Sequence, residues 1–276
     1  MAPAMRRPDA LPDPDHRWVP REHAREDLRR ALVQGGVAGI EVSHPLDNVL
    51  WKIARLVDGD PDLQFGLSGL PGPYDEWDIL EMVAGLAGFE PQRTRRYGPV
   101  EIDAEHVLRG CDLAGDVLAR AAKPGRTAIV ATGHPTGLPI LYMELGRLLL
   151  KRGVELLQPL DGEVWTGGKH NTRRSVRYFH GVAMLTTHGS AVHTHSPEPM
   201  ELMLAEARPD LVLADHGFAG AAIEAGVETI GIADVNDPAL IVAKALGRTE
   251  AVIVMDDNVR PEDYWPCFQA IASRFD

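Results

Sequence analysis

The sequence has few cysteines and lacks any excess of positive charge. Cys111 and Cys267 are the only cysteines among 276 residues, so neither a disulfide framework nor a cysteine-based metal site is expected. Lysine and arginine number 28 against 40 acidic residues, and the formal net charge is -12. An extended nucleic-acid-binding face is therefore not expected. The low cysteine content favours a reducing compartment, and we expect a cytoplasmic protein.

Long apolar segments are also missing. The opening residues MAPAMRRPDALPDPDHRW contain no apolar stretch of the signal-peptide kind, and no run approaches the length of a membrane span. We find neither an internal repeat nor a long low-complexity segment. With 45% hydrophobic and 25% charged residues, the chain has the composition of a globular protein that can bury a full core. No membrane partner is expected.

The first 123 residues have a helical pattern. Residues 1–43 form an N-terminal extension, which we expect to be partly disordered with one helix in REHAREDLRRALVQGG. Residues 44–123 contain three amphipathic stretches, PLDNVLWKIARLV, DEWDILEMVAGLAG and DAEHVLRGCDLAGDVLARAAKPG, joined by segments rich in proline and glycine. We predict a helical domain or cap here, which is also a candidate surface for a homodimer.

Residues 124–276 alternate short apolar runs with helical stretches. The runs are TAIVATG, VELLQPL, VAMLTT, LVLAD, TIGIAD and AVIVMDD. Continuous apolar strands that alternate with helices indicate a parallel sheet covered on both faces. We therefore predict an α/β fold, with a Rossmann-like, mainly parallel sheet and helices on both faces.

Polar side chains collect where these runs end, and parallel sheets place ligand sites at that edge. Any one of them has an ordinary explanation as a helix cap or turn residue. The full set favours function, because every predicted strand end carries His, Asp or Asn. In chain order these residues are His134, Asp161, His188, His193, His195, Asp215, His216, Asp234, Asn236, Asp237, Asp256, Asp257 and Asn258.

Imidazole and carboxylate groups are natural ligands of divalent metal ions such as Zn²⁺ or Mn²⁺. In an extended segment, His193 and His195 point to the same side, and Asp215 with His216 would complete a metal site. Two alternatives stay open. The histidines would bind substrate or transfer protons without a metal, or Asp234, Asp256 and Asp257 would hold Mg²⁺.

Two segments are candidates for phosphate binding. Gly133, Thr136 and Gly137 lie in GHPTGLP, between a predicted strand and a helix, where backbone N–H groups attract anions. This loop matches neither the Walker A pattern nor GxGxxG. Lys169, Arg173 and Arg177 lie in GGKHNTRRSVRYFHG, which we read as a loop followed by a helix. Arginine and lysine suit phosphate oxygens, but a solvated helix face is an equal alternative.

The segments GHPTGL, TTHGSAVHTHSPEPME, DHGFAGAAIEAGVETIGIADVNDP and VIVMDDNV resemble a family of actinobacterial proteins labelled as phosphatases. The resemblance covers roughly residues 44–276 and implies a phosphate-ester substrate. The cap-plus-Rossmann arrangement is also similar in architecture to DUF89-type metal-dependent phosphatases, whose catalytic motif is not matched residue by residue. The DxDx[TV] pattern of haloacid-dehalogenase phosphatases is absent.

Together these features predict a metal-dependent phosphomonoesterase that acts on a small phosphorylated metabolite. We expect His134, Asp234 and His188 to be catalytic, with the metal on His193, His195, Asp215 and His216. Asn236 joins the phosphate-binding residues named above. Two rival functions are a sugar-phosphate isomerase or lyase, and a non-catalytic sensor of a phosphorylated ligand.

Overall fold

The computed structural model describes residues 18–40, 42–168 and 170–275. The disorder expected at the very start of the chain, and the candidate residue Lys169, fall outside these ranges. The helices are α1 (Arg25–Gln34), α2 (Leu46–Val57), α3 (Pro61–Gln64), α4 (Glu76–Ala87), α5 (Ala104–Ala121), α6 (Pro139–Lys151), α7 (Glu198–Glu206), α8 (His216–Glu224), α9 (Pro238–Ala245), α10 (Trp265–Ala272) and the 3₁₀ helix η1 (Pro261–Tyr264). The strands are β1 (Thr127–Thr132), β2 (Glu155–Leu156), β3 (Val164–Gly167), β4 (Thr172–Phe179), β5 (Val182–Thr187), β6 (Ser190–Ala191), β7 (Leu211–Asp215), β8 (Glu228–Ala233) and β9 (Ala251–Val254).

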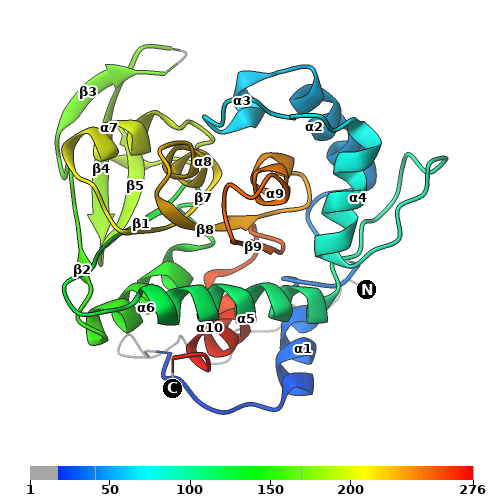
Figure 1. The fold of residues 1–276 in the computed structure, drawn as a ribbon, viewed down its shortest axis with the longest axis horizontal. Coiled ribbons are helices and arrows are strands. Elements are labelled where there is room, and N and C mark those ends of the chain that lie inside the picture. The colour runs from blue at the N-terminus through cyan, green and yellow to red at the C-terminus, as the bar shows by residue number, and fades with distance from the viewer. Residues whose placement is uncertain (1–17, 41, 169, 276) are drawn as a thin grey trace, which may run out of the picture.

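The strands form one open sheet in the order β3-β4-β5-β1-β7-β8-β9, with β2 paired to β1 and β6 to β5. Strands β5, β1, β7, β8 and β9 are parallel to one another, and β3 and β4 extend the sheet antiparallel at one edge. Helices α7, α8 and α9 lie on one side of the sheet and α5, α6 and α10 on the other (Figure 1). The predicted α/β fold with a mainly parallel sheet is confirmed.

Strand β1 is the point where the chain changes direction across the sheet. The chain first goes from β1 to β5 on one side, then returns past β1 to β7, β8 and β9 on the other. In such sheets, the loops that leave the strands on either side of the reversal diverge and open a crevice. A ligand site is therefore expected beyond the carboxyl ends of β5, β1 and β7.

The N-terminal helices are defined by local signals in the sequence. The Asp75 side chain accepts hydrogen bonds from the first turn of α4, whose end lies at Gly88 in the left-handed conformation. Asp103 caps α5 in the same way. The buried hydrophobic residues form a single contiguous cluster, whose first and last members in the chain are Leu28 and Phe275. Helix α5 packs on β9 and α10. Our division of the chain at residues 43 and 123 stays a prediction.

One predicted element is wrong. The basic segment after Gly168 is not a helix but the strand β4, paired antiparallel with β3 and β5. Arg173 and Arg177 are both exposed, and Val176 between them is buried. A spacing of four places two residues on one face of a strand as well as of a helix. The β-formers Val176 and Tyr178 favour the strand, and the charges obscured that signal.

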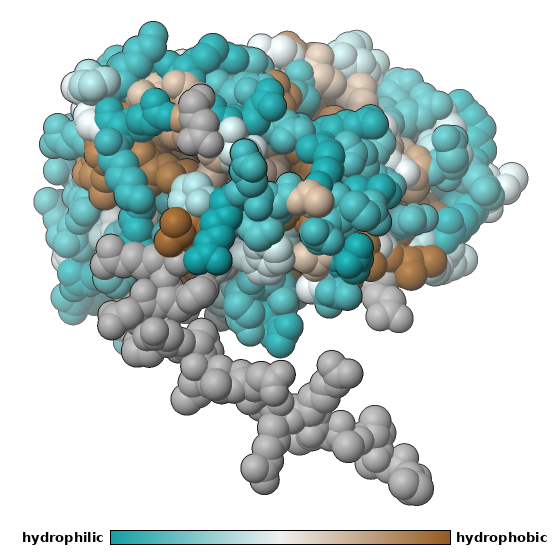
Figure 2. All heavy atoms as spheres, turned by 90° about the horizontal axis from the view of Figure 1, so that it is seen from below, coloured by the Kyte–Doolittle hydropathy of each residue, from teal (hydrophilic) through white to brown (hydrophobic). Residues whose placement is uncertain are grey.

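The helices and the surface are those expected from a chain without long apolar segments. Among the described residues, no helix combines the length and hydrophobicity that crossing a bilayer requires. The face shown in Figure 2 is mainly hydrophilic, with hydrophobic residues visible in separate patches.

Candidate functional site

A cavity of about 360 Å³, which we call the central cavity, opens beyond the carboxyl ends of the parallel strands. It lies where the reversal at β1 predicts a crevice. The residues that line it are His44, Lys52, His134, Pro135, Thr136, Ala191, His193, His195, His216, Asn236, Asp237, Asp257 and Asn258. Most of its walls are therefore built from ionisable or amide side chains.

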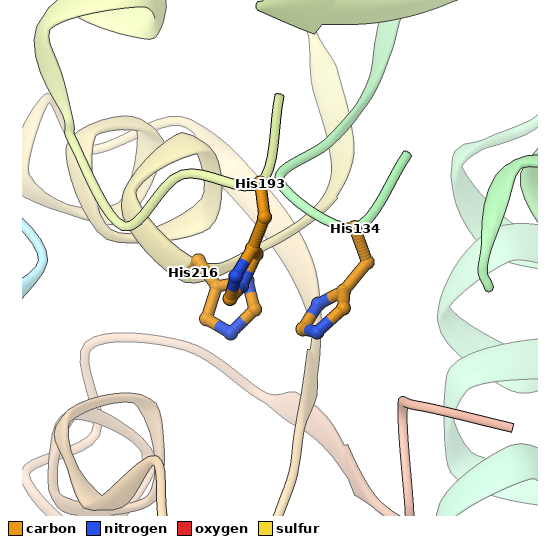
Figure 3. Close-up of side chains that lie close together, drawn as sticks. All are labelled: His134, His193 and His216. Carbon is orange, nitrogen blue, oxygen red and sulfur yellow. The ribbon is translucent and has the colours of Figure 1, made fainter. Parts of the chain in front are cut away.

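Three of the imidazoles that line the central cavity lie close together (Figure 3). His134 follows β1, His193 follows β6, and His216 begins α8. The ring centroid of His134 lies 4.4 Å from that of His193 and 4.5 Å from that of His216. One ring nitrogen from each histidine lies within 4.8 Å of the others, so the three nitrogens can reach one metal ion.

A second possible ligand group shares His216 with the first. It consists of His195, His216 and Asp237, whose ligand atoms also lie within 4.8 Å of one another. The ring of His195 stacks on that of His216 with centroids 4.4 Å apart, and His216 Nε2 lies 3.0 Å from Oδ2 of Asp237. Asp237 also precedes α9, where the sequence alone gave it an ordinary capping role. No side-chain cap hydrogen bond from it is found there, so its carboxylate faces the histidines.

Asp215 stands behind His216, outside the wall of the central cavity. One oxygen lies 2.9 Å from His216 Nδ1 and accepts from the Gly133 N–H, and the other accepts from the Thr132 hydroxyl at 2.6 Å. Such a carboxylate fixes the orientation of an imidazole and leaves its other nitrogen for a ligand. The structure thus places Asp215 next to the predicted ligands, in a position that suits orientation.

Glycine at position 133 allows the segments of the site to approach closely. A Cβ atom there would lie 2.4 Å from the carbonyl oxygen of Thr194 and 3.1 Å from Asp215 Oδ1. The Gly133 carbonyl in turn accepts from the Thr194 N–H. Any larger residue would push the segment that carries His193 and His195 away from the loop that carries His134.

Burial keeps three of the histidines neutral. It lowers the pKa of His134 to about 4 and that of His195 to about 3, and the neighbouring His216 lowers both further. Burial and His216 also lower the pKa of His193. Neutral imidazoles at pH 7 have a free nitrogen lone pair, which is the form that binds a metal ion.

His216 has the opposite behaviour. Burial opposes its protonation, but the carboxylates of Asp237 and Asp215 on its two nitrogens raise its pKa well above the ordinary value. Burial likewise opposes ionisation of Asp237, and the charge and hydrogen bond of His216 lower the pKa of that carboxyl. This pair is therefore ionised, and a metal ion on His216 would replace the proton on Nε2.

The segment around α2 supplies part of the cavity that the sequence did not reveal. His44 lies just before α2, and Asn48 and Lys52 follow within it at intervals of four residues, so they share one face. His44 Nδ1 lies 2.6 Å from Asp234 Oδ2, and Asn48 accepts a hydrogen bond from Asn236 at 2.8 Å. The spacing of four was visible in the sequence, but polar residues at that interval are also typical of a solvent-exposed face.

A side groove of about 640 Å³ adjoins the central cavity and shares His193 and His195 with it. Its other walls come from the α3 region, from the β3–β4 turn and from the segment before α7. These residues are Pro61, Asp62, Gln64, Gly66, Leu67, Ser68, Gly168, His170, Arg174, Thr194, Ser196 and Pro197. The guanidinium of Arg174 is held by Glu198 at 2.7 Å.

The remaining predicted residues divide into two groups. Thr136 and Asn236 line the central cavity, and Gly137 packs behind it against the backbone of Asp257. His188 does not line either cavity, because it is exposed in the tight turn between β5 and β6. Arg173 and Arg177 are exposed on β4, and Arg177 lies 3.9 Å from Asp161. The structure therefore gathers the histidines but leaves most of the basic segment outside.

One family model and one curated protein match nearly the whole chain. A family model described as Phosphatase matches residues 23–276. The chain is 34% identical over 253 residues to "Phosphatase SCO2771" of Streptomyces coelicolor, covering 90% of this chain and 94% of that protein. Among solved structures, an apo cysteine desulfurase from Thermococcus onnurineus matches with a TM-score of 0.27 and 12% identity, over 78% of this chain and 49% of the other. That structural likeness is too weak to carry an argument.

Proposed function

The chain belongs to the phosphatase family, and on this premise we propose that it is a divalent-metal-dependent phosphomonoesterase acting on a small phosphorylated metabolite. The observation that carries the proposal is the convergence of His134, His193, His195 and His216 on one cavity at the ends of parallel strands. Imidazoles with one carboxylate are a donor set for Zn²⁺, Mn²⁺ or a similar ion, provided that His216 gives up its proton on binding.

The side chains present fit such an ion. The Nδ1 atom of His134 is buried and has no hydrogen-bond partner among the described residues. His134, His193 and His216 offer three nitrogens, and His195 with Asp237 offers two further donors on the other side of His216. An ion bound here would polarise the phosphate and lower the pKa of a bound water. In this proposal, Asp215 orients His216 for that task.

Lys52 is our candidate for holding the phosphate group. It reaches the central cavity from α2, and no ion pair of its ammonium group is found among the described residues. Thr136, Asn236 and Asn258 add hydrogen-bond donors on the remaining walls. One cation with several neutral donors suits a dianionic monoester, whose charge the metal shares.

Proton transfer to the leaving group needs an acid at the cavity wall. The pKa of His134 is too low for that role, because burial keeps its imidazole neutral. Burial also opposes protonation of His44, but the hydrogen bond and charge of Asp234 raise its pKa above the ordinary value. We assign the proton donor to His44, with Asp234 as its hydrogen-bond partner.

The side groove is our candidate for the alcohol part of the substrate. It meets the central cavity at His193 and His195, so an ester bound across this junction would place its phosphate over the histidines. The groove is lined by both polar and apolar groups, and its volume of about 640 Å³ is that of a small-molecule site, which supports a small metabolite over a polymer.

The cellular setting is part of the same proposal. Cys111 and Cys267 are buried free thiols, which fits a protein of the reducing cytoplasm. A homodimer stays a prediction.

The test is phosphate release from a panel of phosphomonoesters by protein stripped of metal and then supplied with Mg²⁺, Mn²⁺, Zn²⁺, Ni²⁺ or Co²⁺. We expect release only after metal is restored. Release without metal would remove the ion from the proposal and keep the phosphatase. An isomerised or cleaved product without free phosphate would favour the isomerase or lyase, and saturable binding without turnover would favour a sensor.

A further inference from the structure

A third group of possible ligands consists of Asp234, Asp256 and Asp257, of which Asp257 also lines the central cavity. Asp234 follows β8, and Asp256 and Asp257 follow β9. Their relative exposures are 0%, 1% and 1%, and one oxygen of each lies within 4.8 Å of the others. Three carboxylates this close and this buried repel one another unless positive charge is shared among them.

Hydrogen bonds account for two of the three carboxylates. Asp234 accepts from His44 and from the N–H of Val235. Asp256 accepts from the N–H and hydroxyl of Ser43. Both groups therefore have partners that fix their orientation.

Asp257 has no such partner. Its Oδ2 atom is buried and makes no hydrogen bond with the described residues. Two imidazole nitrogens lie near this carboxylate, His134 Nε2 at 3.5 Å from Oδ1 and His216 Nε2 at 3.8 Å from Oδ2. A buried carboxylate oxygen with no donor destabilises the charged form, so this oxygen calls for a proton or a cation beside it.

The protonation behaviour agrees with this geometry. Burial, together with the charge of Asp234, raises the pKa of Asp257 well above its usual range. Burial also raises the pKa of Asp234 to about 6, even though the hydrogen bond to His44 opposes that shift.

We infer that Asp234, Asp256 and Asp257 form a second divalent-cation site, with Asp257 placed between it and the imidazole site. This inference rests on the proposed function and adds a second ion to it. Ligands that are all carboxylates select a hard ion such as Mg²⁺ or Mn²⁺, whereas the imidazole side suits Zn²⁺ or Mn²⁺. A pair of sites joined by a carboxylate is suited to holding both the attacking and the leaving oxygen of a phosphoryl group.

Residues outside the group are arranged as supports for its ligands. Ser43 and His44 come from the segment before α2 and donate to Asp256 and Asp234, respectively. Metal-binding carboxylates are usually fixed by donors of this kind.

The experiment is a titration of metal-stripped protein with Mn²⁺, read by metal content, by calorimetry and by electron paramagnetic resonance. We expect two ions per chain and a spectrum of magnetically coupled Mn²⁺, because Asp257 joins the sites. Asp257→Asn, which keeps the shape of the side chain, should bind one ion and lose the coupled signal. The matched control Asp58→Asn changes an exposed aspartate outside the cavities and should keep both ions.

The outcomes separate this inference from the proposed function. One ion per chain in the wild type, with phosphatase activity intact, would overturn the second site alone. Two coupled ions without hydrolysis of any ester would keep the site and overturn the phosphatase. Two ions in Asp257→Asn with an unchanged spectrum would also overturn the role of Asp257. If Asp257→Asn does not fold, the wild-type stoichiometry and spectrum still decide.

Discussion

The Nδ1 atom of His44 lies 2.6 Å from Oδ2 of Asp234, although 190 positions separate the two residues in the chain. The imidazole stands at the start of α2 and the carboxylate at the end of β8. This contact joins the N-terminal helices to the sheet at the wall of the central cavity. In the proposed mechanism, the helical region therefore contributes chemistry as well as shape.

Replacing His44 with alanine should distinguish esters by their leaving groups. We expect kcat/KM for an alkyl phosphate to fall by about 10²-fold or more, because the alkoxide needs a proton as it departs. A nitrophenyl ester should lose much less, since nitrophenolate departs without one. His23→Ala is the control, because His23 packs on Trp265 away from the cavity. Equal losses for both esters would remove His44 from proton transfer.

His193→Ala should abolish metal-dependent turnover and leave the fold intact. His193 is more exposed than His134 and His216, so its loss costs less packing, but it removes one of the converging nitrogens. The control is His188→Asn, in the preceding turn, where φ is 51° and asparagine is tolerated. We expect that control to keep its activity, as measured by phosphate release beside thermal unfolding. Inactivity of His188→Asn in a folded protein would restore His188 as a catalytic residue.

Lys52→Ala should weaken substrate binding. A charge-assisted hydrogen bond to phosphate contributes about 1.5–3 kcal/mol, so kcat/KM should fall roughly 10- to 100-fold. Lys52→Arg should recover part of the loss, and Lys151→Ala, at an exposed site at the end of α6, should behave as wild type. Inorganic phosphate, used as a competitive inhibitor, should bind more weakly to Lys52→Ala by a similar factor. An unchanged inhibition constant would contradict a direct contact.

Gly133→Ala should destabilise the protein. The new methyl group would lie 2.4 Å from the Thr194 carbonyl, and overpacking of this kind costs about 1–3 kcal/mol. Gly85→Ala is the control and should have the opposite effect. A Cβ atom added at Gly85, inside α4, would meet nothing within 4 Å, so this variant should raise the free energy of unfolding by roughly 0.5–1 kcal/mol. Urea unfolding of the two variants measures both effects. If Gly133→Ala is as stable as the wild type, the backbone at Thr194 can move away from the new methyl group at no cost.

Glu224 should make stability depend on pH in the acid range. Hydrogen bonds from the Ser68 hydroxyl and N–H, together with the hydrogen bond and charge of Arg248, lower its pKa to about 2. A lowered folded pKa gives stability that is complete above the unfolded value near 4.3 and is lost as pH falls toward 2. Glu224 is partly exposed, so we expect Glu224→Gln to cost about 1 kcal/mol at pH 7. Urea unfolding at pH 7 and at pH 3.5 should show this difference shrinking; a constant difference would contradict the assignment.

The sequence predicted the sheet well because strands β7, β8 and β9 are buried on both faces. LVLAD, TIGIAD and AVIVMDD are continuous apolar runs, a pattern that depends little on what packs against them. Strand β4 was missed because it lies second from the edge of the sheet and carries exposed arginines on one face. There, alternation and helical spacing give similar signals.

The site was only half visible for a related reason. His134, His193, His195 and His216 follow strands, so their convergence could be inferred from the topology of a parallel sheet. Lys52 lies on a helix far upstream, and only tertiary packing brings it to the cavity. Nothing local distinguishes such a side chain from a solvated one.

The hydrogen bonds between Ser43 and Asp256 span 213 positions of the chain. During synthesis, the segment that starts α2 leaves the ribosome long before β9 exists, so Ser43 must wait for the carboxylate that it supports. A nascent chain can form the N-terminal helices and β1 without having any complete centre for ions or phosphate. The protein thus becomes competent only after β9 has been made and has folded against the segment before α2.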